Sequence, residues 1–162
     1  MQYTLVRNFF SRSNRFAITD IHQQPAYQVS KKSSGIFSSV FLLQGEISEH
    51  SVTIKRRSGL MKTGFSIYED DYKVAELTRK MKMLRSHFYL EFLEGTTIQI
   101  ECDTWRKNYV YYKGDEVIAK LKRRSKKMKR VYELTCLEMK HHEILMATVV
   151  ALDQILDQDS SG

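Results

Sequence analysis

Proline, glycine and cysteine are all scarce in this chain of 162 residues. Pro25 is the only proline, and the seven glycines are scattered, with no internal stretch rich in glycine, serine and proline. A flexible linker between two domains is therefore not indicated. We expect a single domain over residues 1–157 and a short flexible tail at 158–162.

Two cysteines, Cys102 and Cys136, are too few for a disulfide framework. Each lies within an alternation of apolar and polar residues, so we interpret both as small core residues in a reducing compartment. Arg7, Arg12 and Arg15 interrupt the start of the chain before any apolar stretch of secretory length. We therefore expect no export signal and a cytoplasmic location, with peripheral contact to a membrane as a further option.

Long hydrophobic runs are missing as well. The longest run, from Ile144 to Leu152, is broken by Thr148 and is less than half of the ~20 residues that a helix needs to span a bilayer. We do not expect a membrane-spanning protein.

Local signatures of catalysis are also missing. The sequence contains no nucleophile elbow, P-loop, dinucleotide-binding glycine motif, zinc-protease helix or zinc-spaced cysteine pair. The acidic segment Glu69–Asp71 could present paired carboxylates, but acids in such a position usually serve the turn itself. We expect neither an enzyme nor a bound cofactor, although a site assembled from distant residues would leave no local motif.

A further candidate, a metal site, is suggested by His141, His142 and Glu143, which follow Glu138. Adjacent histidines on a helix point about 100° apart and do not easily bind one ion, so zinc would need ligands from elsewhere. Solvated residues at a helix N-terminus explain the segment more simply. We expect no metal.

Alternation with a period of two dominates the rest of the chain. Ile98, Ile100 and Cys102, for example, alternate with polar residues, which is typical of half-buried strands. Short turn signals separate such runs. The predicted strands cover residues 2–8, 14–20, 26–32, 39–44, 50–56, 62–69, 72–80, 86–94, 96–103, 107–113, 116–123 and 129–137. This spacing predicts an antiparallel barrel or sandwich.

One segment, from about Glu138 to Asp157, changes to a helical period. Apolar residues cover nearly all sides of it between Ile144 and Leu156, so the helix lacks the polar stripe of a surface helix. We expect the sheet to wrap around it. Leu145→Asp or Val149→Asp should then prevent soluble folding, because a charge would enter a closed core.

Two predicted strands follow acidic turns and share the pattern apolar-Ala-x-Leu, at Val74–Leu77 and Ile118–Leu121, and the helix ends in Ala151-Leu152-Asp153-Gln154-Ile155. Together these features resemble the tubby C-terminal-like superfamily. The resemblance is closest to its LURP-one-related and small bacterial tubby-like branch. It implies a mainly β fold, a closed antiparallel barrel of about twelve strands enclosing a hydrophobic C-terminal helix. Tubby domains bind phosphoinositide headgroups, but no headgroup-binding residue can be matched to a position of this chain.

The net charge of +7 comes from one place, the basic segment 122–130. It holds Lys122, Arg123, Arg124, Lys126, Lys127, Lys129 and Arg130 and no acidic residue, whereas the rest of the chain has 19 basic and 19 acidic residues. Crowded cations at a hairpin tip repel one another, which a bound anion relieves. Lys31, Lys32, Lys55, Arg56, Arg57, Arg79 and Lys80 lie at other strand ends and could join this segment on a shared rim. A solvated loop that only aids solubility is the simpler alternative.

The partner is left open between several classes. The first hypothesis is a monomeric, non-enzymatic binding module whose basic segment engages anionic lipid headgroups or a membrane surface. Nucleic acid is a weaker candidate: basic residues and aromatics such as Trp105, Tyr109 and Tyr132 can form a stacking platform, but aromatics commonly fill strands. The alternative is a protein-interaction or regulatory module in which the charge only steers association.

Overall fold

The computed structural model describes the chain except for residues 12–13, 33–38, 58–63, 84, 127 and 161–162. Within that part, twelve strands precede a single helix, α1, at His142–Ser160. The strands are β1 Gln2–Arg7, β2 Asn14–Thr19, β3 Pro25–Lys31, β4 Val40–Gly45, β5 Ser51–Arg57, β6 Gly64–Glu69, β7 Tyr72–Lys82, β8 Arg85–Phe92, β9 Thr97–Cys102, β10 Asn108–Lys113, β11 Glu116–Lys126 and β12 Lys129–Cys136.

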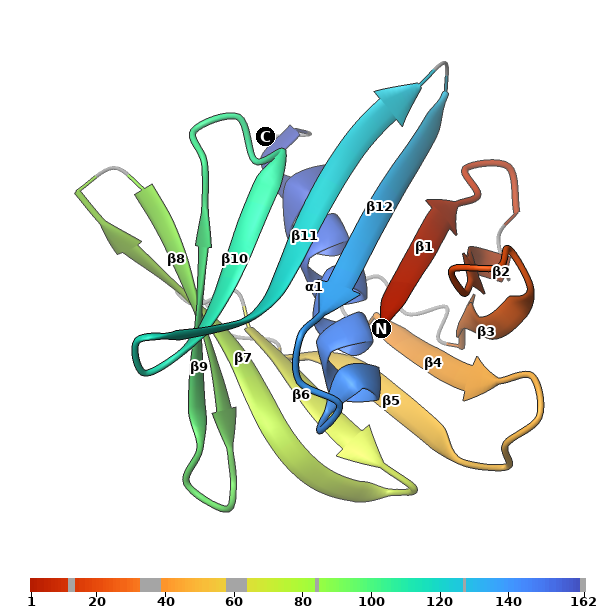
Figure 1. Ribbon diagram of the computed structural model, residues 1–162, viewed down its shortest axis with the longest axis horizontal. Helices are drawn as coiled ribbons and strands as arrows, with labels where there is room; N and C mark the ends of the chain where they lie inside the picture. Colours follow the sequence, from red (N-terminus) through yellow and green to blue (C-terminus); the bar gives the residue numbers. More distant parts are fainter. Residues whose placement is uncertain (12–13, 33–38, 58–63, 84, 127, 161–162) are drawn as a thin grey trace.

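The strands form a closed antiparallel barrel in which each one pairs with its neighbours in the sequence. The pairing of β1 with β12, from Gln2↔Thr135 to Arg7↔Arg130, closes the ring. Figure 1 shows α1 enclosed by these strands. The predicted fold class, a mainly β closed barrel around a hydrophobic C-terminal helix, is confirmed.

The core lies between the inner face of the barrel and α1. Alternate strand residues such as Leu5, Phe41 and Ile67 are fully buried, as are the helix residues from Leu145 to Ala151. Because strand side chains alternate between faces, each strand contributes one face to this lining. A helix that is apolar on all sides therefore finds apolar partners in every direction.

Inside the core, one polar residue of the helix is paired. The Tyr111 hydroxyl and the Thr148 hydroxyl lie 2.8 Å apart, and Thr148 also donates to the Leu145 carbonyl at 2.6 Å. Both side chains are buried, so an unmade bond would leave a desolvated hydroxyl. The Thr148 hydroxyl, which interrupts the apolar run, thus has a hydrogen-bond partner in Tyr111 of β10.

The limits of the helix differ from the prediction at both ends. Residues 138–141 form a turn before the helix, and His141 there has a φ of 66°. At the start of this turn the amides of Leu137 and Glu138 donate to the carbonyl of Ile118. α1 then continues past the predicted end at Asp157 to Ser160. The polar residues there resemble a tail in sequence, but Asp159 forms ion pairs with two arginines of the barrel.

Candidate functional site

The barrel has two ends of opposite charge. In an antiparallel barrel whose consecutive strands are neighbours, successive connections alternate between the ends. The β1–β2, β3–β4, β5–β6, β7–β8, β9–β10 and β11–β12 connections therefore share one end, at which α1 terminates; we call this the basic end. The other connections form the acidic end, where α1 begins.

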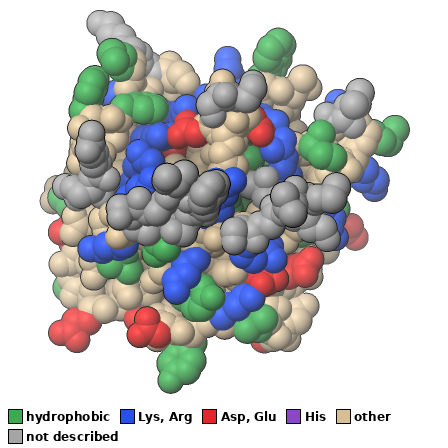
Figure 2. Space-filling view, turned by 180° about the vertical axis from the view of Figure 1, so that it is seen from behind, with side chains coloured by type: hydrophobic (Ala, Val, Ile, Leu, Met, Phe, Trp, Pro, Cys, Tyr) green, Lys and Arg blue, Asp and Glu red, His purple; other side chains and the backbone are tan. Residues whose placement is uncertain are grey.

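Basic residues collect at the basic end from six hairpins. The cations that the sequence placed at strand ends lie there: Lys31, Lys55, Arg56, Arg57, Arg79 and Lys80 in the parts of β3, β5 and β7 nearest to this end, and Lys32 directly after β3. Arg7, Lys82, Arg85, Arg106, Lys107 and the basic segment lie there too. Figure 2 shows Lys and Arg side chains gathered around a few acidic ones, with hydrophobic side chains protruding near the top.

Acidic residues collect at the opposite end. The connections there carry Asp20, Glu46, Glu49, Asp70, Asp71, Glu94, Asp115 and Glu138. The lysines near them are Lys140 and, in the adjoining strand ends of β7 and β10, Lys73 and Lys113. The chain is thus strongly polarised along the barrel axis, which its modest net charge does not reveal. Such separation creates a directed surface potential.

At the centre of the basic end, arginines meet the end of α1 in a helix-end ion cluster, formed by Arg7, Arg130, Tyr132, Asp153 and Asp157. Asp153 is fully buried, and its two oxygens accept from Arg7 at 2.7 Å, from Arg130 at 2.7 Å and from Tyr132 at 2.7 Å. Asp157 lies 2.5 Å from Arg7 and 2.9 Å from Arg130. The last turn of α1 has no basic residue of its own, so the barrel supplies the cations that its C-terminal dipole favours.

These contacts change the proton affinities of the cluster. Burial lowers the pKa of Arg130, but hydrogen bonds and charge from Asp153 outweigh it, so the net pKa is raised. Burial, with the Asp153 charge beside it, raises the pKa of Tyr132. Arg15 lies nearby, and its pKa is lowered by burial and by the positive charge of Arg7. Three arginines, Arg7, Arg15 and Arg130, thus lie around two aspartates, Asp153 and Asp157.

A second group of ion pairs ties two further hairpins to α1. Arg79 of β7 lies 2.9 Å from Asp159, and Arg106 of the β9–β10 turn binds the same carboxylate. Arg123 donates to the backbone carbonyls of Arg106 and Trp105 at 2.9 and 3.2 Å. The basic end is thus held together by its own arginines.

The basic segment divides into inward and outward residues. Arg123 and Arg130 serve the internal contacts just described, while Arg124 faces outward, 3.5 Å from Glu133. Lys122 and Lys129 are exposed, and the described residues provide no ion pair for either. Of Lys126 only the backbone is described, and Lys127 lies outside the described residues. The segment is therefore not one uniform cationic surface.

A hollow of about 270 Å³ opens at the basic end between the β7–β8 hairpin and the β9–β10 turn. It is lined by Met81, Met83, Arg85, Ser86, Cys102, Asp103, Thr104 and Arg106. Two arginines, Arg85 and Arg106, line this concavity with Asp103. A third, Arg79, donates to the lining residue Ser86 at 2.8–3.0 Å. The strand ends named from the sequence include Arg79 but not Arg85 and Arg106, which lie at the start of β8 and in the β9–β10 turn.

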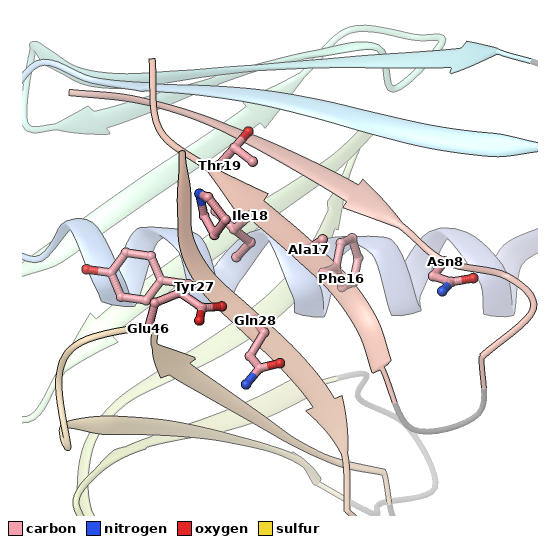
Figure 3. A pocket seen from close by; sticks show the side chains of 9 residues that line it. Asn8, Phe16, Ala17, Ile18, Thr19, Tyr27, Gln28 and Glu46 are labelled. Atoms are coloured by element: carbon pink, nitrogen blue, oxygen red, sulfur yellow. The ribbon is translucent and has the colours of Figure 1, made fainter. Parts of the chain in front are cut away.

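Another depression lies on the barrel wall, over β2 and β3 (Figure 3). Asn8, Ala17, Thr19, Gln28 and Glu46 contribute to it. Figure 3 shows Phe16 and Ile18 directed toward α1 rather than outward. Its lining contains no lysine or arginine, so it does not suit the anion that the basic end attracts.

The start of α1 is less solvated than predicted. Glu143 accepts from the Tyr27 hydroxyl at 2.9 Å and lies 3.2 Å from His50, while His142 lies 3.3 Å from the same hydroxyl. These side chains fasten the helix to β3 and to the β4–β5 connection. Among the described residues, no group of three or more His, Cys, Asp and Glu side chains could hold a metal ion.

The part of the chain that the structure describes contains no helix with the length and hydropathy needed to cross a membrane. The chain has no match among curated proteins and none among solved structures. It does match one family, described as LURP-one-related, over residues 1–153. Since this match covers all twelve strands of the barrel and most of α1, the chain belongs to the LURP-one-related family of the tubby-like superfamily.

Proposed function

We propose that this tubby-like protein is a non-enzymatic module that binds phosphate-bearing anionic ligands at the basic end of its barrel. One observation carries the proposal: six hairpins bring their basic residues to one end while the acidic connections lie at the other. A closed barrel fixes these cations at neighbouring positions. An anion relieves their mutual repulsion at little cost in conformational entropy.

Two sets of cations have different roles in this proposal. Arg7, Arg130 and Arg79 are paired with aspartates and hold the hairpins in place. Arg85 and Lys129 are exposed, and the described residues provide neither with an ion pair. Exposed side chains of this kind are free to contact a phosphate.

The hollow beside Arg85 and Arg106 is the best place for a single phosphate group. Arginine presents paired donors that match phosphate oxygens. Arg106 is already held by Asp159, so its orientation is set before a ligand arrives. Asp103 opposes an anion, but it is occupied by the backbone amide of Lys107 and by Asn108, at 2.7 and 2.8 Å.

The test uses a soluble probe, inositol hexakisphosphate, and the full chain. We expect the probe to raise the melting temperature of the wild type in a salt-sensitive manner. Arg85→Ser combined with Lys129→Ser should weaken binding about tenfold or more, at ~1 kcal/mol for each cation. The matched control is Lys120→Ser combined with Lys140→Ser, which removes two exposed cations from the wall and the acidic end and should leave binding unchanged.

Two results would contradict the proposal. One is the absence of any probe-dependent shift in the wild type at low salt. The other is equal binding by both double variants, which would mean that the basic end has no special role. Either result would favour the alternative of a protein-interaction module, in which these charges only steer association.

A further inference from the structure

Large apolar side chains project from four connections at the basic end. Phe10 of the β1–β2 connection is 80% exposed, Met83 of the β7–β8 turn 89%, Trp105 of the β9–β10 turn 75% and Met128 of the β11–β12 turn 74%. Exposed apolar residues are common on protein surfaces, so the charges around these four decide what they can contact. We call these four residues the apolar tips.

The topology directs the apolar tips to the same side of the molecule. Their connections share the end at which α1 terminates, the upper side of Figure 1. β7 and β11 have 11 residues each, and their ladders continue to Lys82↔Arg85 and Lys126↔Lys129. Met83 and Met128 therefore stand at the ends of the two longest hairpins, beyond the mouth of the barrel.

Cations flank the apolar tips. Lys82 and Arg85 lie beside Met83, Arg106 and Lys107 beside Trp105, and Lys129 beside Met128. An interfacial membrane anchor has the same composition, since apolar groups enter the boundary between headgroups and acyl chains while lysine and arginine meet anionic headgroups. Tryptophan in particular favours this boundary.

The acidic end provides an internal comparison. It also has exposed apolar side chains, including Ile47, Tyr72 and Leu93, but Glu46, Asp71 and Glu94 stand directly beside them. An anionic surface would repel this end. Charge therefore selects which end meets a membrane, although both ends have apolar residues.

From this arrangement we infer that the basic end docks on an anionic bilayer, with Phe10, Met83, Trp105 and Met128 inserted at the headgroup boundary. This inference rests on the proposed function and names the bilayer, rather than a soluble phosphate compound, as the partner. The end of α1 at which Asp157 and Asp159 lie then faces the membrane, and the acidic end faces the solvent. The ion pairs of the basic end keep the hairpins in this geometry before contact.

Trp105 is the only tryptophan of the chain, so its fluorescence reports insertion without labelling. The full chain is titrated with vesicles of phosphatidylcholine and phosphatidylserine at a ratio of 7:3, and with phosphatidylcholine alone. With the anionic vesicles we expect the emission to shift to shorter wavelength and acrylamide quenching to decrease. Lipids brominated near the headgroup end of the acyl chains should quench the emission. Phosphatidylcholine alone should have little effect.

A triple variant, Phe10→Ser with Met83→Ser and Met128→Ser, tests the apolar tips and keeps Trp105 as reporter. We expect its partition into anionic vesicles to fall about tenfold or more, because three apolar side chains no longer leave water. The matched control, Ile47→Ser with Tyr72→Ser and Leu93→Ser, removes exposed apolar side chains from the acidic end. Its partition should stay within about twofold of the wild type.

The results separate this inference from the proposed function. If the triple variant binds vesicles as the wild type does, or if bound wild type shows no change in Trp105 emission, insertion is excluded. Retained binding of inositol hexakisphosphate would then leave the proposed function intact. If both vesicles and the soluble probe fail to bind, both statements are overturned. Insertion is supported if the triple variant loses vesicle binding but keeps the soluble probe.

Discussion

Arg130 reaches from the basic segment into the barrel and binds Asp153 of α1, with its Nη1 atom 2.7 Å from Asp153 Oδ1. The Asp153 side chain is fully buried and that of Arg130 is 16% exposed. One member of the basic segment is therefore an internal partner of the helix. Its neighbour Lys129 is exposed. Of these two adjacent residues, Arg130 therefore has a structural role and Lys129 belongs to the surface.

This difference predicts unequal costs of substitution. Arg130→Ala should lower the free energy of unfolding by about 2–4 kcal/mol, because it removes one partner of a largely buried pair. Lys129→Ala should change it by less than ~0.5 kcal/mol, as is usual for an exposed site. Urea unfolding of both variants measures the two values. Equal values would show that Arg130 does not stabilise the helix end.

The bond between Tyr111 and Thr148 predicts non-additive behaviour. Tyr111→Phe or Thr148→Val should each cost about 1–3 kcal/mol, since each leaves a buried hydroxyl without this partner. The double variant should cost clearly less than the sum, because both hydroxyls are then gone. A double-mutant cycle by chemical denaturation gives the coupling energy. A coupling energy near zero would show that the 2.8 Å contact contributes nothing.

His50 predicts a dependence of stability on pH. Burial lowers its pKa, but the hydrogen bond to Asp70 and the charges of Glu143, Asp70 and Glu69 raise it more, so the net pKa lies above the usual 6.5. A raised pKa in the folded state means that protonated His50 stabilises folding below pH 6.5, and that this stabilisation is lost as the pH rises through the folded value. The effect is about 0.2–1 kcal/mol for a partly exposed pair.

The measurement compares the wild type with His50→Gln between pH 5.5 and 8. The pKa of His141 is lowered by burial and by Lys140, which gives the opposite slope, so the difference between the two proteins isolates His50. We expect the wild type to be more stable than the variant at low pH and the difference to shrink as the pH rises. A constant difference would mean that His50 does not titrate in this range.

Val149 tests the enclosure of the helix. Its side chain is 0% exposed at the middle of α1, so Val149→Asp places a carboxylate in a closed apolar core. The cost, several kcal/mol, rivals the whole stability of a typical domain, and we expect no soluble folded protein. Ile47→Asp, at a fully exposed position, is the control and should fold. A cooperative thermal transition of Val149→Asp would contradict the buried position of α1.

Most of the fold followed from two local periodicities. The alternation of Ile98 and Ile100 with Thr97 and Gln99 predicted β9, and both isoleucines are buried in it. The all-round apolar segment around Val149 required an enclosing sheet. The helix was predicted to start too early, because Glu138–Lys140 favour a helix by their intrinsic propensity. In the structure the amide of Glu138 instead donates to the carbonyl of Ile118 in β11.

The candidate site was harder to predict than the fold from local sequence pattern. Arg7 and Arg106 have no acidic partner near them in the sequence, since the aspartates that they bind lie 146 and 53 residues away. Only the closed topology brings them to one end. The alternation of connections could have identified a common basic rim, because six hairpins on one side are a consequence of strand order. The shared location of the apolar tips could have been predicted in the same way, since each tip lies in a connection between two predicted strands.

The pairing of β1 with β12 has a consequence for biosynthesis. The first strand cannot complete its hydrogen bonding until a partner about 130 residues later has left the ribosome, and α1 is made after all twelve strands. Contacts so distant in the chain form slowly, and the inner apolar faces have nothing to cover them meanwhile. We therefore expect a nascent chain to depend on chaperones until α1 emerges, and a chain halted before α1 to be degraded rather than to form a partial barrel.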